Sequence, residues 1–307
     1  MASRATVAAY VVVEGDPAWR IDRMASERLG LASRSRSRKL IRKGEILLNG
    51  AICESSRFVH PGDRLELLAA VEPPPVFEMP LRVVWSDPHF AVIEKPAGLF
   101  VSGNRHRTVE HALLFNLPVS DAPDALPFPR PVHRLDGRTS GLLAVARSAS
   151  AQVGLGRAFE NREVHKRYRA IVAGRLEGSG VVSEDVDGKV ARSEWATLTH
   201  TRSLHIDWTT TVDVWPHSGR KHQIRVHMAS LGHAVLGDDL YETGKVLRSQ
   251  GLFLFAAELR LDHPVTGQPM RFELPEPPKF ESYRAREERR WQAHQTRSSE
   301  QECGDLE

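Results

Sequence analysis

The segment PVHRLDGRTSGLLAVARS, from Pro131 to Ser148, holds a single carboxylate, Asp136, between an arginine and a Thr-Ser-Gly turn. The apolar run that begins at Leu142 predicts a buried strand. Reactive side chains are commonly held on loops that a rigid strand fixes in place. Asp136 is therefore a candidate catalytic carboxylate, and an ordinary solvated loop acid is the alternative.

Short apolar strands lie on both sides of this segment, from Leu81 to about Tyr283, with glycine, proline and aspartate at the breaks. Examples are FAVIEK, YRAIVAG and FAAELRL, and helical stretches interrupt the series. This mixture predicts an α+β domain on a mixed, mainly antiparallel sheet, which we place at residues 81–285.

A second block, HSGRKHQIRVHMASLGHAVLGD, runs from His217 to Asp238 and predicts a helix that ends at Gly232. Apolar residues recur in it at helical spacing, namely Ile224, Met228 and Leu231. Arg220 or Arg225, near the helix start, could reach a carboxylate in the core cleft and keep it ionised and oriented. A buried structural salt bridge explains the same residues equally well.

The same block contains four histidines, the commonest ligand type of metal sites: His217, His222, His227 and His233. The chain has no HExxH motif, and the five-residue spacings place the first three on different faces of a helix. Structural or RNA-contacting histidines are the better interpretation. The sequence also lacks the strand–GxSxG–helix arrangement of a serine hydrolase and a full dinucleotide loop, so we expect neither a metal nor a cofactor.

The residues ahead of the α+β domain predict a small basic module. One helical pattern ends at Gly30, and Ser33 is a candidate N-cap for a second helix, RSRSRKLIRK. Asn49 and Gly50 then predict a hairpin turn between two short strands, and PGDRLELL predicts one more strand.

The second of these helices has six basic residues and no acid between Arg34 and Lys43. Most charge runs are solvated faces. Arginines held rigidly on a helix beside a hairpin can bridge phosphates, however, so RNA binding is the favoured interpretation. The expected RNA contacts are Arg34, Arg36, Arg38 and Lys39.

Composition restricts the class of protein. The chain has 307 residues, a formal charge of +3 and a sequence pI of about 9.0, so any nucleic-acid affinity has to come from clustered charge. Its two cysteines, Cys53 and Cys303, exclude a disulfide framework and suit a reducing cytosol. No apolar run reaches the length of a membrane span, and the opening ATVAAYVVV is a poor signal peptide. We expect a cytoplasmic protein without membrane contact.

The segment VEPPPVFEMP separates the two parts, because three consecutive prolines favour an extended, semi-rigid spacer. The expected organisation is an N-terminal extension or short strand at 1–14, the basic module at 15–70, the linker at 71–80, the α+β domain at 81–285 and a charged tail at 286–307. The polar composition of this tail predicts a frayed helix or a disordered segment.

Several of these motifs resemble known families. RMASERLGLASRSRSRKLIRKGEILLNG with PGDRL, roughly Arg20 to Leu67, resembles the RNA-binding module named after small-subunit ribosomal protein S-four. The later blocks EKPAGL, HRLDGRTSGLLAVARS, HKRYRAIVAG, GRKHQIRVHMASLGHAVLGDDLY and DHPVTG resemble, in that order, the RluA-type pseudouridine synthases. This resemblance spans nearly all of Leu81 to Glu276 and implies a pseudouridine-synthase catalytic domain preceded by a small α/β RNA-binding domain.

The resemblance also implies an activity, the isomerisation of specific uridines to pseudouridine in structured RNA, with large-subunit ribosomal RNA favoured. It makes Asp136 the catalytic carboxylate, places Tyr168 against the target base and pairs Arg225 with the aspartate. The expected substrate contacts around them are Arg134, Thr139, Arg220 and His222.

The sequence departs from the most frequent family pattern at three positions, Glu94, Arg138 and Lys221. None belongs to the implied catalytic trio, so they bear on the choice of RNA more than on the reaction. A transfer-RNA modifier is the alternative within the same class, and a non-catalytic RNA-binding or ribosome-assembly factor is the alternative outside it. The presence of all three catalytic residues argues against the latter. We expect a monomer.

Overall fold

The computed structural model describes residues 6–42, 44–69, 75–241 and 250–304. The chain divides into two compact units, Met1–Pro75 and Val76–Glu307, so the division falls inside the proline-rich segment. Lys43 of the basic helix and residues 70–74 of that segment lie outside the described residues. Within the described part of the chain, no helix is long and apolar enough to cross a membrane.

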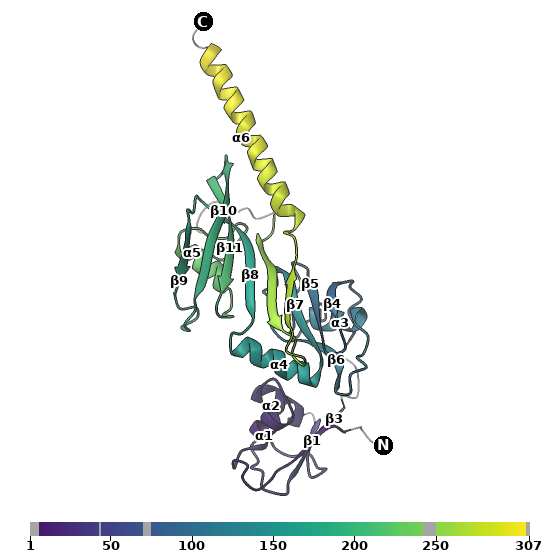
Figure 1. The fold of residues 1–307 in the computed structure, drawn as a ribbon. Helices are drawn as coiled ribbons and strands as arrows, with labels where there is room; N and C mark the ends of the chain where they lie inside the picture. Colours follow the sequence, from purple (N-terminus) through teal and green to yellow (C-terminus); the bar gives the residue numbers. More distant parts are fainter. Residues whose placement is uncertain (1–5, 43, 70–74, 242–249, 305–307) are drawn as a thin grey trace. The chain divides into compact units, whose positions relative to one another are not determined.

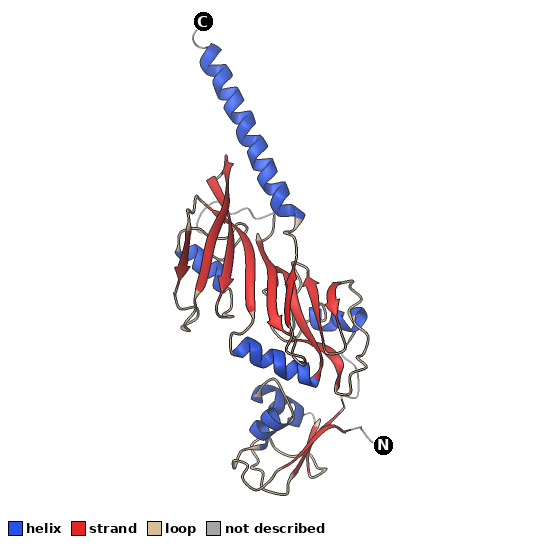
Figure 2. Cartoon of the chain, viewed as in Figure 1, coloured by secondary structure: helices blue, strands red, loops and turns tan. Residues whose placement is uncertain are grey.

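The small unit is a three-stranded antiparallel sheet with two helices (Figures 1 and 2). Its elements are β1 (Thr6–Val11), α1 (Ile21–Arg28), α2 (Arg34–Arg42), β2 (Ile46–Leu48) and β3 (Arg64–Leu68). The sheet order is β1-β3-β2, so the segment expected as an extension or short strand is an edge strand of this sheet. Apolar residues of both helices and two strands form its core: Ile21, Met24, Ile41, Ile46 and Leu65.

Local signals in this unit set the helix and turn positions. The Arg36 N–H donates to the Ser33 hydroxyl at 3.2 Å, which is the expected N-cap of α2. Asn49 and Gly50 both have positive φ, at 52° and 77°, as a two-residue hairpin turn requires. The prediction of two hairpin strands is wrong in its second half, because the chain leaves the ladder after a single bridge between Leu48 and Ala51. The strand that pairs with β2 is β3, from residues 64–68, on the opposite edge from Ala51.

The large unit is built on one ten-stranded sheet in the order β4-β5-β7-β12-β8-β11-β10-β9, with β6 paired to β7 and β13 to β12. The strands are β4 (Arg82–Ser86), β5 (Phe90–Lys95), β6 (Ala125–Pro131), β7 (Ser140–Ser148), β8 (His165–Ala173), β9 (Ser179–Val182), β10 (Ser193–Ser203), β11 (Asp207–Pro216), β12 (Leu254–Asp262) and β13 (Pro269–Glu273). The helices are α3 (Val109–Asn116), α4 (Ala149–Glu160), α5 (Gln223–Ser230) and α6 (Pro278–Gly304). This is the predicted mixed, mainly antiparallel α+β architecture.

The sheet separates two layers of apolar packing. On one face, α4 and the start of α6 pack over a cluster that includes Leu155, Phe255 and Phe280. On the other face, α3 and α5 each cover a separate cluster. The Tyr168 side chain of β8 contacts both of these clusters, so it lies between the areas that α3 and α5 cover.

One parallel strand pair joins the two antiparallel halves of the sheet. β12 lies between β7 and β8, and it meets β7 only at the pairs Phe255–Ser140 and Ala256–Gly141. Gly141 has φ of +118°, and a Cβ there would lie 2.3 Å from the Ala256 carbonyl oxygen. Only glycine permits this approach. Ala256 is also the register partner of Tyr168, so Gly141, Ala256 and Tyr168 form one row across three strands.

The charged C-terminal segment is helical rather than frayed, since α6 continues to Gly304 and extends away from the sheet (Figure 1). Its first turns are anchored, because Tyr283 is buried and the Ser203 hydroxyl donates to Glu287 at 2.8 Å. The later described side chains are mostly exposed.

Candidate active site

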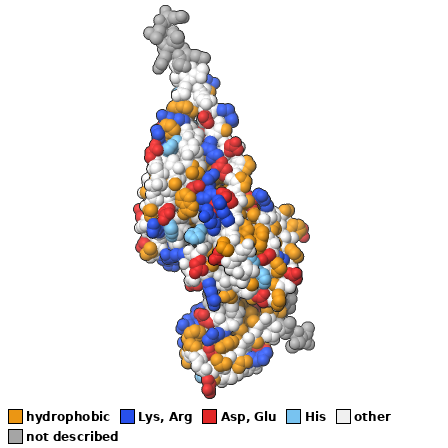
Figure 3. All heavy atoms as spheres, viewed as in Figure 1, with side chains coloured by type: hydrophobic (Ala, Val, Ile, Leu, Met, Phe, Trp, Pro, Cys, Tyr) orange, Lys and Arg blue, Asp and Glu red, His pale blue; other side chains and the backbone are white. Residues whose placement is uncertain are grey.

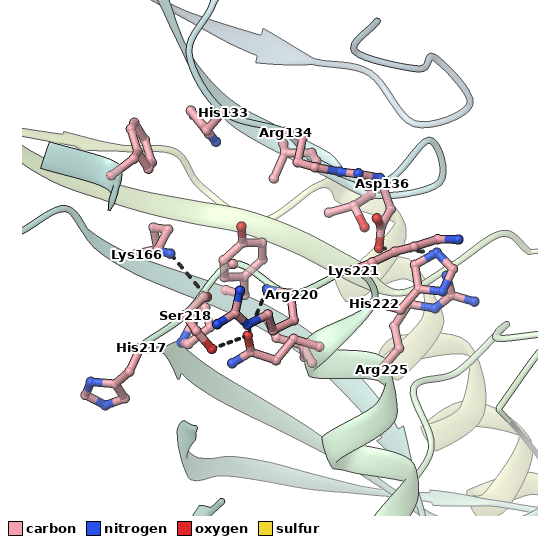
Figure 4. A pocket seen from close by; sticks show the side chains of 18 of the residues that line it. His133, Arg134, Asp136, Lys166, His217, Ser218, Arg220, Lys221, His222 and Arg225 are labelled. Carbon is pink, nitrogen blue, oxygen red and sulfur yellow. Dashed lines mark hydrogen bonds and ion pairs between the residues drawn. The ribbon is translucent and has the colours of Figure 1, made fainter. Parts of the chain in front are cut away.

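A cavity of about 430 Å³ opens beside Asp136 in the large unit (Figure 4). Five segments line it: residues 133–139 before β7, the end of α4 with the start of β8, residues 216–222, the first turn of α5, and Leu254 at the start of β12. The structure brings all seven site residues predicted in this unit into this lining, namely Arg134, Asp136, Thr139, Tyr168, Arg220, His222 and Arg225, and it adds Lys166 and His133.

The Asp136 carboxylate is held in a turn and is free of close partners. The Thr139 N–H donates to the Asp136 carbonyl oxygen at 3.0 Å, which closes the turn. The side chain is 17% exposed, and the nearest basic side chain is that of His222, with Nε2 3.8 Å from Oδ2. Among the described residues, neither carboxylate oxygen accepts a hydrogen bond or pairs with a lysine or arginine. The carboxylate is therefore available to a bound substrate.

A buried lysine supports this turn from behind. Lys95 at the end of β5 is fully buried, and its ammonium donates to the carbonyl oxygens of Leu99 at 2.6 Å, Pro96 at 2.8 Å and Gly137 at 3.2 Å. Burial lowers the pKa of Lys95 to about 8, and the negative charge of Asp136 opposes that shift. This lysine belongs to the EKPAGL block but is not among the residues that the sequence predicts for the site. A lysine that ends the apolar run FAVIEK is the signal that could have identified it.

Tyr168 faces the same cavity from the middle of the sheet. Burial raises the pKa of its hydroxyl above the ordinary value, and the negative charge of Asp136 raises it further. The phenol is therefore neutral, and it is close enough to Asp136 for the two to interact electrostatically. Among the described residues, no group hydrogen-bonds to this hydroxyl, which leaves it free for a ligand.

The neighbouring arginines of β8 have a different role, because alternate side chains of a strand point to opposite faces. Arg167 and Arg169 both bind Asp213 of β11, and Arg167 also reaches Glu273 at 2.6 Å. Figure 3 shows basic and acidic side chains gathered over the middle of the large unit. This network ties β8 to its neighbours on the face away from Tyr168.

The implied pairing of Arg225 with Asp136 is not what the structure shows. Arg225 binds Asp238 in a bidentate pair, at 2.6 Å from Nε and 2.7 Å from Nη2, and both side chains are almost fully buried. Burial alone would raise the pKa of Asp238, but the Arg225 hydrogen bonds and the Leu240 N–H hold it below its usual value. An unpaired charge costs more free energy at the buried Asp238 than at the partly exposed Asp136, because water can solvate the latter. Arg225 therefore acts on Asp136 through space, by its charge.

Loss of the Asp238 carboxylate should destabilise the fold strongly. Asp238→Asn leaves the Arg225 guanidinium buried without a counter-charge, and breaking a buried pair in this way costs about 3–5 kcal/mol. The free energy of unfolding, measured by urea titration, should fall by that amount. Asp239→Asn is the matched control, because the adjacent Asp239 is 59% exposed and pairs with Arg138 at the surface, where pairs are worth about 0–1 kcal/mol. Equal losses in the two variants would contradict the assignment.

The remaining predicted contact residues differ in whether the protein already occupies their polar groups. The Thr139 hydroxyl is buried in the cavity wall without a hydrogen-bond partner in the described structure, so it can bind a ligand. Arg134 is exposed at the cavity, whereas Arg220 donates from Nε to the Val190 carbonyl oxygen at 3.3 Å. Burial lowers the pKa of His222, against the effect of Asp136, so its imidazole is neutral at neutral pH.

Two other histidines of the block have structural partners. His227 is fully buried between the Ser193 hydroxyl at 2.9 Å and the Glu184 carbonyl oxygen at 3.0 Å. His233 lies 2.7 Å from the Ala173 carbonyl oxygen. The described residues contain no group of three His, Cys, Asp or Glu side chains arranged for a metal ion.

A further histidine, which the sequence does not predict as a site residue, packs under the site. His133 stacks on Phe159 with ring centroids 4.4 Å apart, and its Nε2 accepts the Ala144 N–H at 2.9 Å. Burial lowers the pKa of His133 to about 3, so it stays neutral and fixes the start of the Asp136 loop to β7.

In the small unit, the four predicted RNA contacts fall into two kinds. Arg34 and Arg38 both bind the buried Asp22, with the Arg38 Nε at 2.6 Å. They therefore hold α2 against α1, although their side chains remain about half exposed, at 45% and 49%. Arg36 and Lys39 make no ion pair within the described residues. Figure 3 shows basic side chains over the part of this unit that holds α1 and α2.

Comparison with known proteins places both units. Residues 89–230 match the model of a family described as RNA pseudouridylate synthase, and residues 19–65 match the S4 domain. An uncharacterized RNA pseudouridine synthase of Aquifex aeolicus (strain VF5) is 32% identical over 88% of this chain and 94% of its own length. Ribosomal large subunit pseudouridine synthase D of Escherichia coli O6:H1 is 32% identical over 90% and 93%, and that of Nitrosomonas europaea is 33% identical over 84% and 81%. The solved structure of human RNA pseudouridylate synthase domain containing 1 is 27% identical, with a TM-score of 0.55 over 66% of this chain and 86% of that one.

Proposed function

This chain belongs to the RNA pseudouridylate synthase family, and from that premise we propose that it converts uridine to pseudouridine in large-subunit ribosomal RNA with Asp136 as its catalytic carboxylate. One observation carries the assignment of Asp136. It is a carboxylate in the wall of a cavity, held by a fixed turn and free of hydrogen bonds and of lysine or arginine partners among the described residues.

The reaction is an isomerisation, so no atom is gained or lost. The bond between uracil N1 and ribose C1′ breaks, the base turns, C5 bonds to C1′, and the proton on C5 moves to N1. A carboxylate can start this sequence by adding to the ribose, by adding to the base or by removing a ribose proton. Each of these routes requires a carboxylate with a free oxygen, and the Asp136 oxygens accept no hydrogen bond from the described residues. The target base has to leave its stack first, at a cost of a few kcal/mol.

Tyr168 would contact the displaced base and take part in removing the C5 proton. Its ring offers an aromatic surface beside Asp136, on which a flipped uracil can stack. Its hydroxyl is neutral, because burial and Asp136 both raise its pKa. A neutral phenol accepts a proton only if its own proton leaves in the same step. The carboxylate of Asp136, whose charge reaches this hydroxyl, is the group placed to receive it.

Arg225 would serve as a fixed positive charge. It cannot turn toward the substrate, because Asp238 holds two of its nitrogens and the Tyr241 ring covers it, with a centroid 5.1 Å away. A cation held in this way favours the ionised form of a nearby carboxylate. Arg225 would therefore place a positive charge near Asp136 without occupying its oxygens.

The choice of ribosomal RNA rests on the curated relatives, whose names specify the large ribosomal subunit, and on the S4 domain. Mass-resolved mapping of pseudouridine in RNA from a strain without the protein tests it, with the loss of a site in large-subunit RNA expected. Loss in transfer RNA would favour the alternative modifier. Unchanged pseudouridine in every RNA would favour a non-catalytic assembly factor. We also propose that the enzyme acts as a monomer in the cytoplasm, which size-exclusion chromatography and fractionation would test.

The basic helix should contribute to RNA affinity mainly through Arg36 and Lys39. Replacing both with alanine removes two phosphate contacts, so the slope of log affinity against log salt should become shallower by about 1.4–1.8. Arg34→Ala or Arg38→Ala is a poorer test, because it also leaves the buried Asp22 with one cation fewer. Arg64→Ala is the control, since Arg64 lies in β3 of the same unit and pairs with Glu66. Unchanged affinity and slope in the double variant would make α2 a solvated face.

A further inference from the structure

A second cavity, of about 520 Å³, lies in the large unit beside the loop that holds Asp136. Residues 97–100 after β5, residues 105–107 before α3, and two residues ahead of β4 line it. Neither the predicted catalytic residues nor the S4 domain contributes to it. Its lining combines two aromatic rings with two arginines, Phe77, Phe100, Arg105 and Arg107.

The aromatic rings are accessible and already carry cations. Phe100 is 44% exposed, and the Arg105 guanidinium lies 4.7 Å from its ring centroid. Arg107 lies 5.5 Å from the centroid of Phe77, and the His106 ring meets the edge of Phe77 at 5.7 Å. A single exposed phenylalanine would need no explanation. An exposed ring with an arginine over it and open space beside it is the kind of platform on which proteins stack an unpaired base.

The positive charge at this cavity is uncompensated. Arg105 and Arg107 are exposed, and within the described part of the chain neither pairs with a carboxylate. The sequence from Pro96 to Val109 contains no acidic residue at all. By contrast, Arg167 and Arg225 of the same unit are each held by carboxylates. Free guanidinium groups beside an aromatic platform fit a nucleotide, which presents a base and a phosphate together.

This cavity is coupled rigidly to the catalytic turn. The Gly98 N–H donates to the Gly137 carbonyl oxygen at 2.7 Å, and Lys95 binds the same oxygen at 3.2 Å. The Phe100 ring packs against Gly137, where an added Cβ would lie 3.1 Å from it. The platform is thus fixed against the residue that follows Asp136, within the neighbourhood of a uridine bound at Asp136.

We propose that this cavity binds a second unpaired nucleotide of the substrate RNA, with its base on Phe100 and its phosphate at Arg105 and Arg107. The proposal rests on the proposed function. It makes the enzyme recognise two unstacked nucleotides rather than one, so target choice depends on a flexible position next to the uridine as well as on the uridine itself.

A double-mutant cycle between protein and RNA tests this site. The RNA is the ribosomal fragment that contains the mapped uridine, made intact and with an abasic nucleotide at each flanking position in turn. With wild-type protein, one abasic position should raise KM by about 5- to 150-fold, the range for the loss of one stacked base. Phe100→Ala should raise KM similarly on intact RNA and show no further rise on that abasic RNA. Turnover at saturating RNA should be unchanged.

Phe115→Ala is the matched control, because Phe115 is 52% exposed on α3 and lines neither cavity. Arg105→Ala with Arg107→Ala should weaken binding and reduce its salt dependence. The proposal is overturned if the effects of Phe100→Ala and of every abasic position are additive, or if Phe100→Ala binds intact RNA as wild type does. If either result is seen while the wild-type protein forms pseudouridine normally, only the proposed role of this cavity is rejected. If the wild-type protein forms no pseudouridine, the proposed function is rejected.

Discussion

Asp136→Asn should abolish pseudouridine formation while the fold and the RNA affinity stay nearly unchanged. The amide has almost the shape of the carboxylate, and the turn that holds it uses the backbone, so no structural contact is lost. An amide cannot act as a carboxylate nucleophile or base. Turnover should therefore fall at least about a thousandfold, the scale typical of removing a catalytic group. Single-turnover assays on the ribosomal fragment measure the loss, and equilibrium binding measures the affinity.

Asp121→Asn is the control for this experiment, because it removes an exposed loop carboxylate that lies outside both cavities. It should leave turnover and affinity at wild-type levels. If Asp136→Asn turns over close to wild type, Asp136 returns to the status of a solvated loop acid, and the catalytic group has to be sought elsewhere in the cavity wall.

Tyr168→Phe should bind RNA normally and turn over about a hundred to ten thousand times more slowly, the contribution usual for a positioned proton-transfer group. The phenyl ring keeps the stacking surface, and only the hydroxyl near Asp136 is lost. Because the pKa of this hydroxyl is raised above its ordinary value, it stays neutral at every pH at which the enzyme would be assayed. The pH dependence of the wild-type reaction should therefore show no tyrosine ionisation.

Comparing Tyr168→Ala with Tyr168→Phe separates the contribution of stacking from that of proton transfer. It should lose turnover as well as base engagement, the latter by about 1–3 kcal/mol. Tyr168 also packs between two apolar clusters, so the alanine variant should have a lower melting temperature and the phenylalanine variant a near-normal one. A fully active Phe variant would restrict Tyr168 to stacking or packing and leave the proton acceptor unidentified.

Local features of this protein were predictable, because short-range chemistry determines them. Ser33 caps α2, Gly232 with φ of +80° follows α5, and the mixed, mainly antiparallel sheet follows from short apolar strands. The motif resemblance also placed Asp136 and Tyr168 in one cavity wall.

The partner of a side chain or a strand was harder to predict from the sequence than its position in the fold. Arg225 is thirteen residues from Asp238 in sequence, yet the turn after Leu236 brings that carboxylate to it. Nothing in the spacing indicates that this acid is more deeply buried than Asp136. The second arm of the hairpin was also mispredicted, because the chain makes a single bridge to β2 at Ala51 and the ladder partner of β2 is the later strand β3. Competition between partners is a property of the whole fold, which no local pattern encodes.

The position of β12 has a consequence for when the enzyme becomes active during its own synthesis. Asp136 precedes β7 and Tyr168 lies in β8, but β12, which begins at Leu254, is the strand between them. More than a hundred residues separate Gly141 from its partner Ala256, and such distant pairings form late because a long loop has to close first. A nascent chain that ends before β12 has the catalytic residues but lacks the strand that sets their spacing. We therefore expect a chain that ends before β12 to be inactive while it is still attached to a ribosome.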